Sequence, residues 1–380
     1  MSDGDEYVSE ELDHARPPKH VLENECHNVI LAEYGIAVAA YYRNKATTEG
    51  TTRISDKQPV RKASTSDGYF EVLDLIEHGT FGRVAKCRDR ETGEIIAVKR
   101  VKTAMSTHKE LKAFAVLTNH PAIPQFYQAV HENGAYLIAM QYMPVADLAQ
   151  TVGNLTVNGR KFYLRQMFLG LDYIHSKGLM HRDIKLENLI IVPEWLQLKI
   201  IDYGMAQMYI PGRKYNVVGS IHMMFQAPEV ALRYPYYNYA IDMWSAGCVA
   251  FAVLCSRHEP SFFHYKPEEM LFNLTKILGS ANLRRFVEKY QISTEGYTRL
   301  FTLYHRANYF RTILKPVQAS FVESLLIFDF QKRPSALQTL QHPYFKDVEN
   351  IVPCRDNLHL PDDAQSDMSD RRKEPKCVLL

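Results

Sequence analysis

The segment from His181 to Asn188 constrains this chain more than any other, because it places several reactive polar groups within eight residues. Asp183 supplies a carboxylate that can accept a proton, Lys185 a positive charge, and Asn188 an amide oxygen that can bind a hard cation. Fourteen residues after Asn188, an apolar run ends at Asp202, a second hard oxygen donor. This spacing favours a catalytic site over a solvated charged loop.

The two motifs, H-R-D-I-K-L-E-N and D-Y-G, resemble the catalytic loop and the metal-binding D-F-G segment of eukaryotic protein kinases. The resemblance implies that Asp183 orients the substrate hydroxyl and accepts its proton, and that Asn188 and Asp202 bind Mg²⁺. It also implies that Lys185, the serine/threonine-type choice at its position, contacts the γ-phosphate of ATP. The expected activity is therefore phosphate transfer from ATP to serine and threonine hydroxyls of protein substrates.

A strand-rich region upstream contains the candidate nucleotide site. Short apolar alternation broken by glycines predicts three antiparallel strands between residues 69 and 102. The run G-T-F-G-R-V and the triplet A-V-K resemble the glycine-rich loop and strand lysine of kinases, although Glu77 stands where the first glycine is expected. The resemblance assigns nucleotide binding to Gly79, Gly82, Val84, Ala97, Lys99, Glu110 and Met143.

Glu110 belongs to this set as the carboxylate partner of Lys99, on a helix predicted over residues 108–117. The other expected ion pair joins Glu229, in the triplet A-P-E, to Arg333. By resemblance these two residues are structural, as are Arg182 and Asp242. Asp242 would brace the catalytic loop through backbone hydrogen bonds.

The periodicity of the chain changes after the strand predicted over residues 136–142. Apolar residues recur at helical spacing from Leu164 to Ile174, and Met243 to Cys255 is an almost wholly apolar run suited to a buried helix. We therefore predict an α+β, bilobal protein kinase fold over residues 68–346. The β-rich N-lobe would span residues 68–142, and the helical C-lobe residues 143–346.

Within the kinases, the segment from Tyr209 to Val217, together with Leu278-Gly279-Ser280 and Lys289 to Ile292, resembles the casein kinase II catalytic subunit of the CMGC group. The resemblance leaves open a regulatory subunit bound to the N-lobe. That family carries basic residues before its helix glutamate and in its activation segment, and most of this charge is missing here. We therefore do not expect its preference for acidic substrates. Between Met205 and Gln226 the only hydroxyl of Ser or Thr is that of Ser220, so we expect constitutive activity.

Composition excludes several other classes of protein. The 45 basic and 43 acidic residues give a formal net charge of +2, which offers no case for nucleic-acid binding. The cysteines have neither zinc-site nor C-x-x-C spacing, which is expected in a reducing compartment; they are Cys26, Cys87, Cys248, Cys255, Cys354 and Cys377. We expect a cytoplasmic protein, with a nuclear pool left open.

The two ends of the chain differ in composition from its centre. Residues 1–67 predict a partly disordered extension, polar at 1–20 and 43–67, in which the apolar stretch Val29 to Tyr42 is too short for a bilayer span and packs against the main domain. Residues 347–380 predict a disordered tail. It ends in Cys377-Val378-Leu379-Leu380 after a basic stretch, a C-a-a-X pattern that predicts prenylation of Cys377 and membrane association.

Two other functions remain open from the sequence. A pseudokinase would keep the fold as a binding or scaffold module, and Glu77 is the departure that favours it, whereas Lys99, Asp183, Asn188 and Asp202 are all present. A membrane-tethered adaptor would rest on the Cys377 tail alone.

Overall fold

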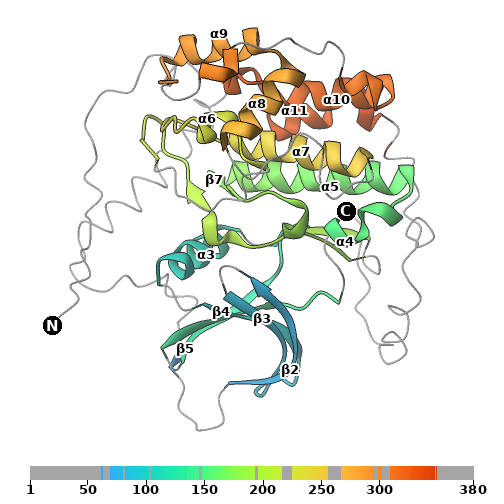
Figure 1. Cartoon of the computed structure of the whole chain (residues 1–380). Helices are drawn as coiled ribbons and strands as arrows, with labels where there is room; N and C mark the ends of the chain where they lie inside the picture. Colours follow the sequence, from blue (N-terminus) through green and yellow to red (C-terminus); the bar gives the residue numbers. More distant parts are fainter. Residues whose placement is uncertain are drawn as a thin grey trace, which may run out of the picture.

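The computed structural model describes residues 61–62, 69–79, 82–101, 104–117, 119–132, 134–144, 148–192, 196–215, 225–255, 267–294, 298–301, 309–346 and 348. A β-sheet forms the N-terminal part of these residues and helices form most of the C-terminal part (Figure 1). The α+β, bilobal fold expected from the sequence is therefore confirmed.

A six-stranded sheet, in the order β1-β5-β6-β4-β3-β2, forms the N-lobe. The three strands expected between residues 69 and 102 are present as an antiparallel unit, and a further hairpin follows the helix α3, Ala104–Val116. The strands are β1 Arg61–Lys62, β2 Phe70–Gly79, β3 Gly82–Asp89, β4 Ile95–Val101, β5 Phe126–Glu132 and β6 Ala135–Gln141.

Strand β1 lies within the N-terminal extension, whose partial disorder stays a prediction. Residues 43–67 were expected to be poorly ordered because of their polar composition, yet Arg61 and Lys62 pair in parallel with Val130 and His131 of β5. A neighbouring strand satisfies backbone hydrogen bonds whatever the side chains are, so local polarity did not forbid this strand.

The two faces of the sheet differ. Val84 lies opposite Lys99 on the paired strands β3 and β4, so their side chains share a face with Ala97, two residues away. That face packs on the main core, whereas Ala85, Cys87, Ile96, Val98 and Ala139 form a second buried cluster on the opposite face. The core-facing side of the sheet is the one that meets the C-lobe.

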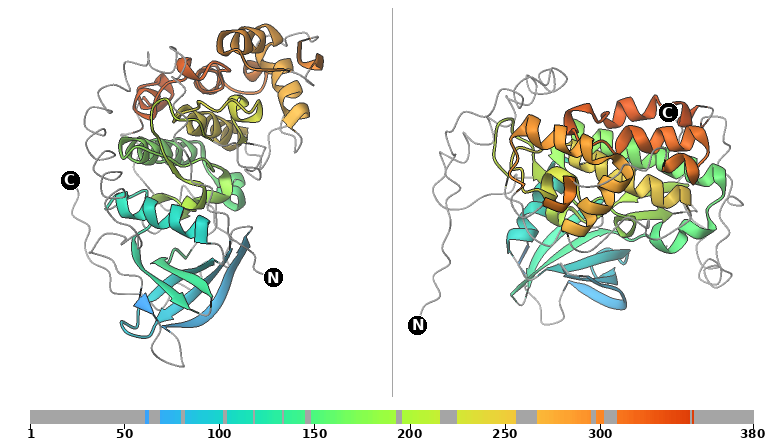
Figure 2. Two further views of the ribbon diagram at one scale, coloured as in Figure 1. Left: turned by 90° about the vertical axis from the view of Figure 1, so that its left-hand side faces the viewer. Right: turned by 45° about the horizontal axis from the view of Figure 1, so that its top comes forward.

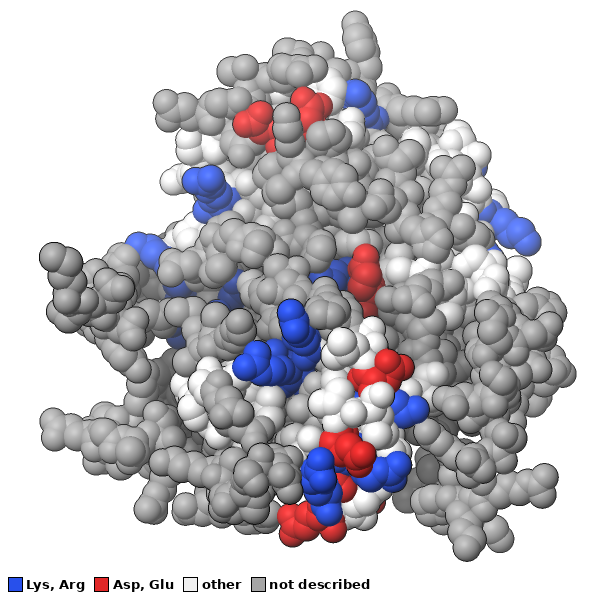
Figure 3. All heavy atoms as spheres, turned by 60° about the horizontal axis from the view of Figure 1, so that its bottom comes forward, with Lys and Arg blue, Asp and Glu red and all other residues white. Residues whose placement is uncertain are grey.

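On the sheet side of the molecule, side chains of both charges lie at the surface (Figure 3).

The C-lobe is built from helices joined by short 3-10 turns. Its α-helices are α4 Leu148–Thr151, α5 Val157–Ser176, α6 Pro228–Ala231, α7 Ala240–Cys255, α8 Pro267–Leu278, α9 Ser280–Tyr290, α10 Pro316–Leu325 and α11 Ala336–Leu340. The 3-10 turns are η1 Val152–Asn154, η2 Leu186–Asn188, η4 Tyr203–Met205, η6 Thr298–Phe301, η7 Phe310–Thr312, η8 Phe330–Lys332 and η9 Pro343–Phe345. Two small antiparallel sheets, β7 Leu179–Met180 with β10 Gln207–Met208 and β8 Leu189–Val192 with β9 Gln197–Ile200, lie beside them.

Helix α5 shows why these residues take this structure. The side chain of Thr156 caps its first turn by accepting from the Gly159 N–H, and Gly178, at φ +72°, follows its end. At Gly170 a Cβ would lie 2.7 Å from the Ile200 Cδ1, so glycine permits the close packing of α5 on β9. This packing holds in place the strand that leads to Asp202.

Helix α3 lies between the sheet and the helical lobe in every view (Figures 1 and 2). It begins at Ala104, four residues before the predicted start at 108, and carries Glu110 toward the junction of the two lobes. The site expected from the sequence is therefore assembled from both lobes.

Several expectations fall outside the described residues: disorder of 1–20 and 347–380 beyond Val348, packing of Val29 to Tyr42, and prenylation of Cys377. Within the described part of the chain, no helix combines the length and the apolar character that a bilayer span requires.

Candidate active site

Lys99 forms the centre of the first half of the site. Its Nζ lies 3.0 and 2.9 Å from the two carboxylate oxygens of Glu110 and 2.7 Å from Oδ1 of Asp202. The pairing of Lys99 with Glu110 that the sequence predicted is present, and it joins β4 to α3. The contact with Asp202 also joins the N-lobe to the C-lobe.

The charged state of this cluster follows from its contacts. Burial alone would lower the pKa of Lys99, but the carboxylates of Glu110 and Asp202 outweigh burial and raise that pKa. Burial would likewise raise the pKa of Asp202, but Lys99 outweighs it and lowers that pKa. Burial raises the pKa of Glu110, and Lys99 offsets this only in part. The ammonium and the Asp202 carboxylate are thus both charged at neutral pH.

Asp202 is held in an uncommon backbone conformation. Its φ of +62° is left-handed, a region that Asp tolerates better than most residues because its short side chain bonds the local backbone. Here Oδ1 of Asp202 accepts from the Gly204 N–H at 3.3 Å. The next residue, Tyr203, is fully buried, and its hydroxyl donates to the Ile200 carbonyl at 2.8 Å. The ring of Tyr203 lies edge-on to Phe114 of α3, which ties the Asp202 segment to the helix of Glu110.

The second half of the site is the loop between β7 and β8. The Asn188 amide nitrogen donates to Oδ2 of Asp183 at 2.8 Å and to its carbonyl at 2.7 Å. Nζ of Lys185 lies 3.0 Å from the same Oδ2. Asp183 is 5% exposed, so these bonds fix its carboxylate in one orientation. All three polar residues that the motif singled out are therefore within contact of one another.

Asp242, in the first turn of α7, supports this loop. Its carboxylate accepts from the His181 N–H at 2.8 Å and from the Arg182 N–H at 2.7 Å, and lies 2.9 Å from Nε2 of His175. This is the bracing expected of Asp242. It also stabilises Arg182 at a φ of +68°, which a non-glycine residue adopts at a cost.

The loop and the Asp202 segment are bonded to each other. The Ile201 N–H donates to the Asn188 carbonyl at 2.9 Å, and Nε2 of His181 lies 3.0 Å from the Ile201 carbonyl. Burial lowers the pKa of His181, so the neutral ring can serve this contact. These two bonds link the catalytic loop directly to the segment that carries Asp202.

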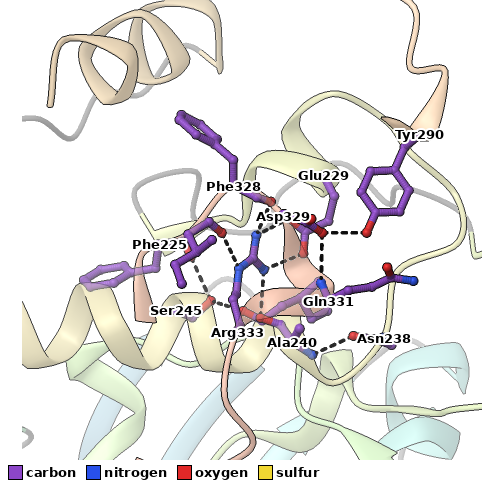
Figure 4. Close-up of polar contacts among 12 residues, drawn as sticks. Phe225, Glu229, Asn238, Ala240, Ser245, Tyr290, Phe328, Asp329, Gln331 and Arg333 are labelled. Carbon is purple, nitrogen blue, oxygen red and sulfur yellow. Dashed lines mark hydrogen bonds and ion pairs between the residues drawn. The ribbon is translucent and has the colours of Figure 1, made fainter. Parts of the chain in front are cut away.

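Glu229 and Arg333 form the second predicted ion pair, in the C-lobe. Nη1 and Nη2 of Arg333 lie 2.6 and 2.7 Å from the two oxygens of Glu229, and both side chains are fully buried (Figure 4). The other N–H groups of the guanidinium donate to backbone carbonyls of Ile327, Phe328 and Ala240. The pair joins the end of the activation segment to the segment after α10.

The polar groups present fit a nucleotide with a divalent cation. Lys99 and Lys185 against Glu110, Asp183 and Asp202 give a formal charge of −1, which favours a cation. The Asn188 amide oxygen and the Asp202 carboxylate are the hard donors that such ions take. Val84 and Ala97 on the core-facing side of the sheet, and the half-buried Met143 just beyond β6, are apolar residues suited to a base. Gly79 and Gly82 face each other at the end of the β2–β3 hairpin.

The family model for the protein kinase domain matches residues 70–345. The chain belongs to the protein kinase family. Kinase domains use ATP and a divalent metal, and this agrees with the donor set of the site. A probable serine/threonine-protein kinase from Dictyostelium discoideum is 31% identical over 296 residues, which cover 74% of this chain and 48% of that protein. The chain therefore spans about half the length of this curated relative.

Some residues of the kinase site were not found from the sequence. His175 and His181 support the catalytic loop through Asp242 and Ile201, and Tyr203 links the Asp202 segment to α3. The histidine that opens the catalytic-loop motif was a usable signal for His181. Nothing in the sequence marked His175, because its partner lies 67 residues away.

Proposed function

We propose that this kinase transfers the γ-phosphoryl group of ATP to serine and threonine hydroxyls of proteins. The observation that carries the proposal is the fixed orientation of Asp183 by Asn188 and Lys185, in a loop bonded to the Asp202 segment. Phosphoryl transfer requires positioning and charge stabilisation more than covalent chemistry, so such a fixed array is what the reaction needs.

Each residue then has a defined task. The Asp183 carboxylate orients the incoming hydroxyl and accepts its proton, while Lys99 and Lys185 hold phosphate oxygens by charge. Asn188 and Asp202 would hold Mg²⁺, which supplies charge neutralisation of the phosphates when bound. Glu110 keeps Lys99 directed at the site from α3.

Phosphate transfer from Mg-ATP to a degenerate Ser/Thr peptide library tests this function, with wild type and Asp183→Asn compared. We expect wild type to transfer phosphate and the variant to lose transfer by about 10²- to 10⁴-fold, the contribution of a general base. A folded wild type that transfers none would favour the pseudokinase alternative instead.

We also propose that the chain is a divergent relative of the casein kinase II catalytic subunit, in the CMGC group, without a preference for acidic substrates. The segment 209–217 and the missing basic residues support this. Each exposed contact with an acidic side chain contributes about 0.5–1 kcal/mol, so the loss of several removes the preference. The same peptide library tests it: enrichment of Asp or Glu around the phosphorylated residue would contradict this proposal.

Finally, we propose that activity does not require phosphorylation of the activation segment. Its support is the scarcity of acceptors, Ser220 being the only Ser or Thr between Met205 and Gln226. One observation points the other way: Nε and Nη2 of the buried Arg182 have no hydrogen-bond partner among the described residues, and a phosphoryl group would satisfy them. Unchanged activity after phosphatase treatment, and in Ser220→Ala, is expected; loss in both would contradict the proposal.

A further inference from the structure

A small cavity opens on the C-lobe, away from the active site. Its volume is about 260 Å³, and it lies between α9 and the segment that follows α10. Helix α9 is at the end of the helical lobe opposite the sheet (Figure 1). The residues that line the cavity are Asn282, Arg285, Phe286 and Lys289 on α9, and Phe328, Asp329 and Lys332 beyond α10. None of them belongs to the nucleotide-binding or catalytic residues described above, and Phe328 contacts only the structural Arg333 there.

Asp329, the acidic residue of the cavity, is bonded to three neighbouring groups. Oδ2 of Asp329 lies 2.9 Å from Nζ of Lys289. Its Oδ1 accepts from the Tyr290 hydroxyl at 2.6 Å and from the Gln331 N–H at 3.3 Å (Figure 4). Burial would raise the pKa of Asp329, but the hydrogen bonds from Tyr290 and Lys289 outweigh burial and lower that pKa. Asp329 therefore neutralises Lys289, and it forms no ion pair with the other two cations of the cavity.

Those two cations, Arg285 and Lys332, are both exposed. Neither side chain forms a hydrogen bond or an ion pair with any residue that the structure describes. Three cations and one carboxylate give the cavity a formal charge of +2, carried by these two side chains. A charge that lines a concavity without a counter-ion favours an anionic ligand.

The rest of the cavity limits what this anion can be. Phe286 and Phe328, 1% and 2% exposed, form a rigid apolar wall, and the Phe328 carbonyl is fixed by Arg333. The volume lies below the range of about 300–1,000 Å³ that is typical of small-molecule sites, so one side-chain-sized group fits better than a cofactor. Membrane attraction relies on clusters of about four to eight basic residues, more than this cavity has. A peptide is therefore favoured over a lipid surface.

A phosphoryl group matches this cavity best among side-chain anions. It carries about −1.5 to −2 charges at pH 7, which balances the two unpaired cations, and its three oxygens accept several hydrogen bonds at once. The guanidinium of Arg285 can bind two such oxygens side by side, and Lys332 supplies a second charge. We propose that the α9 cavity binds a phosphorylated serine or threonine of a protein partner, held between Arg285 and Lys332.

Binding can be measured without any phosphate transfer. An array of phosphoserine and phosphothreonine peptides, each beside its unphosphorylated twin, is probed with the full chain, and the tightest pair is titrated by fluorescence anisotropy. We expect the phosphorylated member to bind at least tenfold more tightly. Arg285→Gln and Lys332→Gln should each weaken binding by about tenfold, the loss of one charge-assisted contact.

Arg284→Gln is the matched control. The substitution removes the same charge from an exposed position of the same helix, but the Arg284 side chain contacts Phe301 and does not line the cavity. Arg284→Gln should bind the phosphopeptide as wild type does. Asp183→Asn should also bind it as wild type does, which distinguishes failure of the binding proposal from failure of the proposed kinase activity. The proposal is overturned by equal binding of both twins, by wild-type binding in both cavity variants, or by an equal loss in Arg284→Gln. It is also overturned if only vesicles of anionic lipid bind through Arg285.

Discussion

Two of the buried ion pairs that the structure describes, at Lys99 and at Arg333, are built differently. Lys99 is one ammonium shared by Glu110 and Asp202, and the Asp202 side chain keeps 21% of its surface exposed. Arg333 instead forms two parallel bonds to a single carboxylate, and both side chains are fully buried. The guanidinium is saturated, whereas the shared ammonium can exchange a partner for a phosphate.

This difference separates a reactive charge cluster from a structural one. Repulsion from Asp202 is one cause of the raised pKa of Glu110, so the active-site cluster is not arranged for greatest stability. The Arg333 pair has no such conflict, and its ring of carbonyl partners leaves nothing for a ligand to bind. Substitutions in the first region should therefore affect chemistry, and those in the second should affect folding.

Arg333→Met should give the largest effect on stability. It leaves the Glu229 carboxylate buried without a partner, which costs about 3–5 kcal/mol in the free energy of unfolding, measured in urea. Arg311→Met is the control, since its pair with Glu323 is largely exposed and should contribute less than about 1 kcal/mol. Equal effects of the two variants would remove the distinction between the regions.

Asp202→Asn should act on the reaction instead. Loss of a carboxylate that would hold Mg²⁺ against the phosphates should lower the rate of phosphate transfer by about 10²- to 10³-fold. Lys99 keeps Glu110 as its partner and the repulsion between the carboxylates is relieved, so the free energy of unfolding should change by less than about 1 kcal/mol. Asp74→Asn, at an exposed position on β2, should leave both quantities unchanged.

Tyr203→Phe tests the link between the Asp202 segment and α3. The substitution removes the hydroxyl that donates to Ile200 but keeps the ring against Phe114, so it should cost about 1 kcal/mol of stability. Transfer activity per folded molecule should be retained. A loss of activity as large as that of Asp202→Asn would show that the hydroxyl, and not the ring, positions the segment.

The smallest expected effect is on the pH dependence of stability. Burial would raise the pKa of Asp242, but the hydrogen bond from His175 and the neighbouring charges outweigh it and lower that pKa. Its contribution is therefore present above the ordinary value of 3.8 and is lost as the pH falls through the folded value. Asp242→Asn should make the loss of unfolding free energy shallower as the pH falls below 3.8.

Asp172→Asn should change the pH dependence of stability in the opposite direction. Burial raises the pKa of Asp172, so its contribution is present below its ordinary value and is lost as the pH rises through the folded one. Removal of this group should make the loss on acidification steeper. The same change of slope in both variants would contradict these assignments.

The sequence predicted the reactive polar residues better than the residues that hold them in place. Lys99, Asp183 and Asn188 could be found because phosphoryl transfer fixes both residue type and spacing. The contact of Lys185 with Asp183 depends on how the loop folds, and no spacing rule predicts it. The expected ion pairs could be named because the motifs that contain them are recognisable separately.

Features made by distant segments could not be predicted. The α9 cavity joins residues near 285 to residues near 330, and each half alone is an ordinary polar surface. Strand β1 pairs with residues almost 70 positions later, and its two basic side chains carry no strand signal. In both cases tertiary contacts, and not local preference, determine the structure.

The most direct test of the central claim measures transfer rate and unfolding free energy on the same preparations of wild type, Asp202→Asn and Arg333→Met. We predict that Asp202→Asn loses transfer and keeps its stability, while Arg333→Met loses stability and keeps transfer per folded molecule. Transfer at the wild-type rate by folded Asp202→Asn would contradict the assignment of this site to phosphate chemistry.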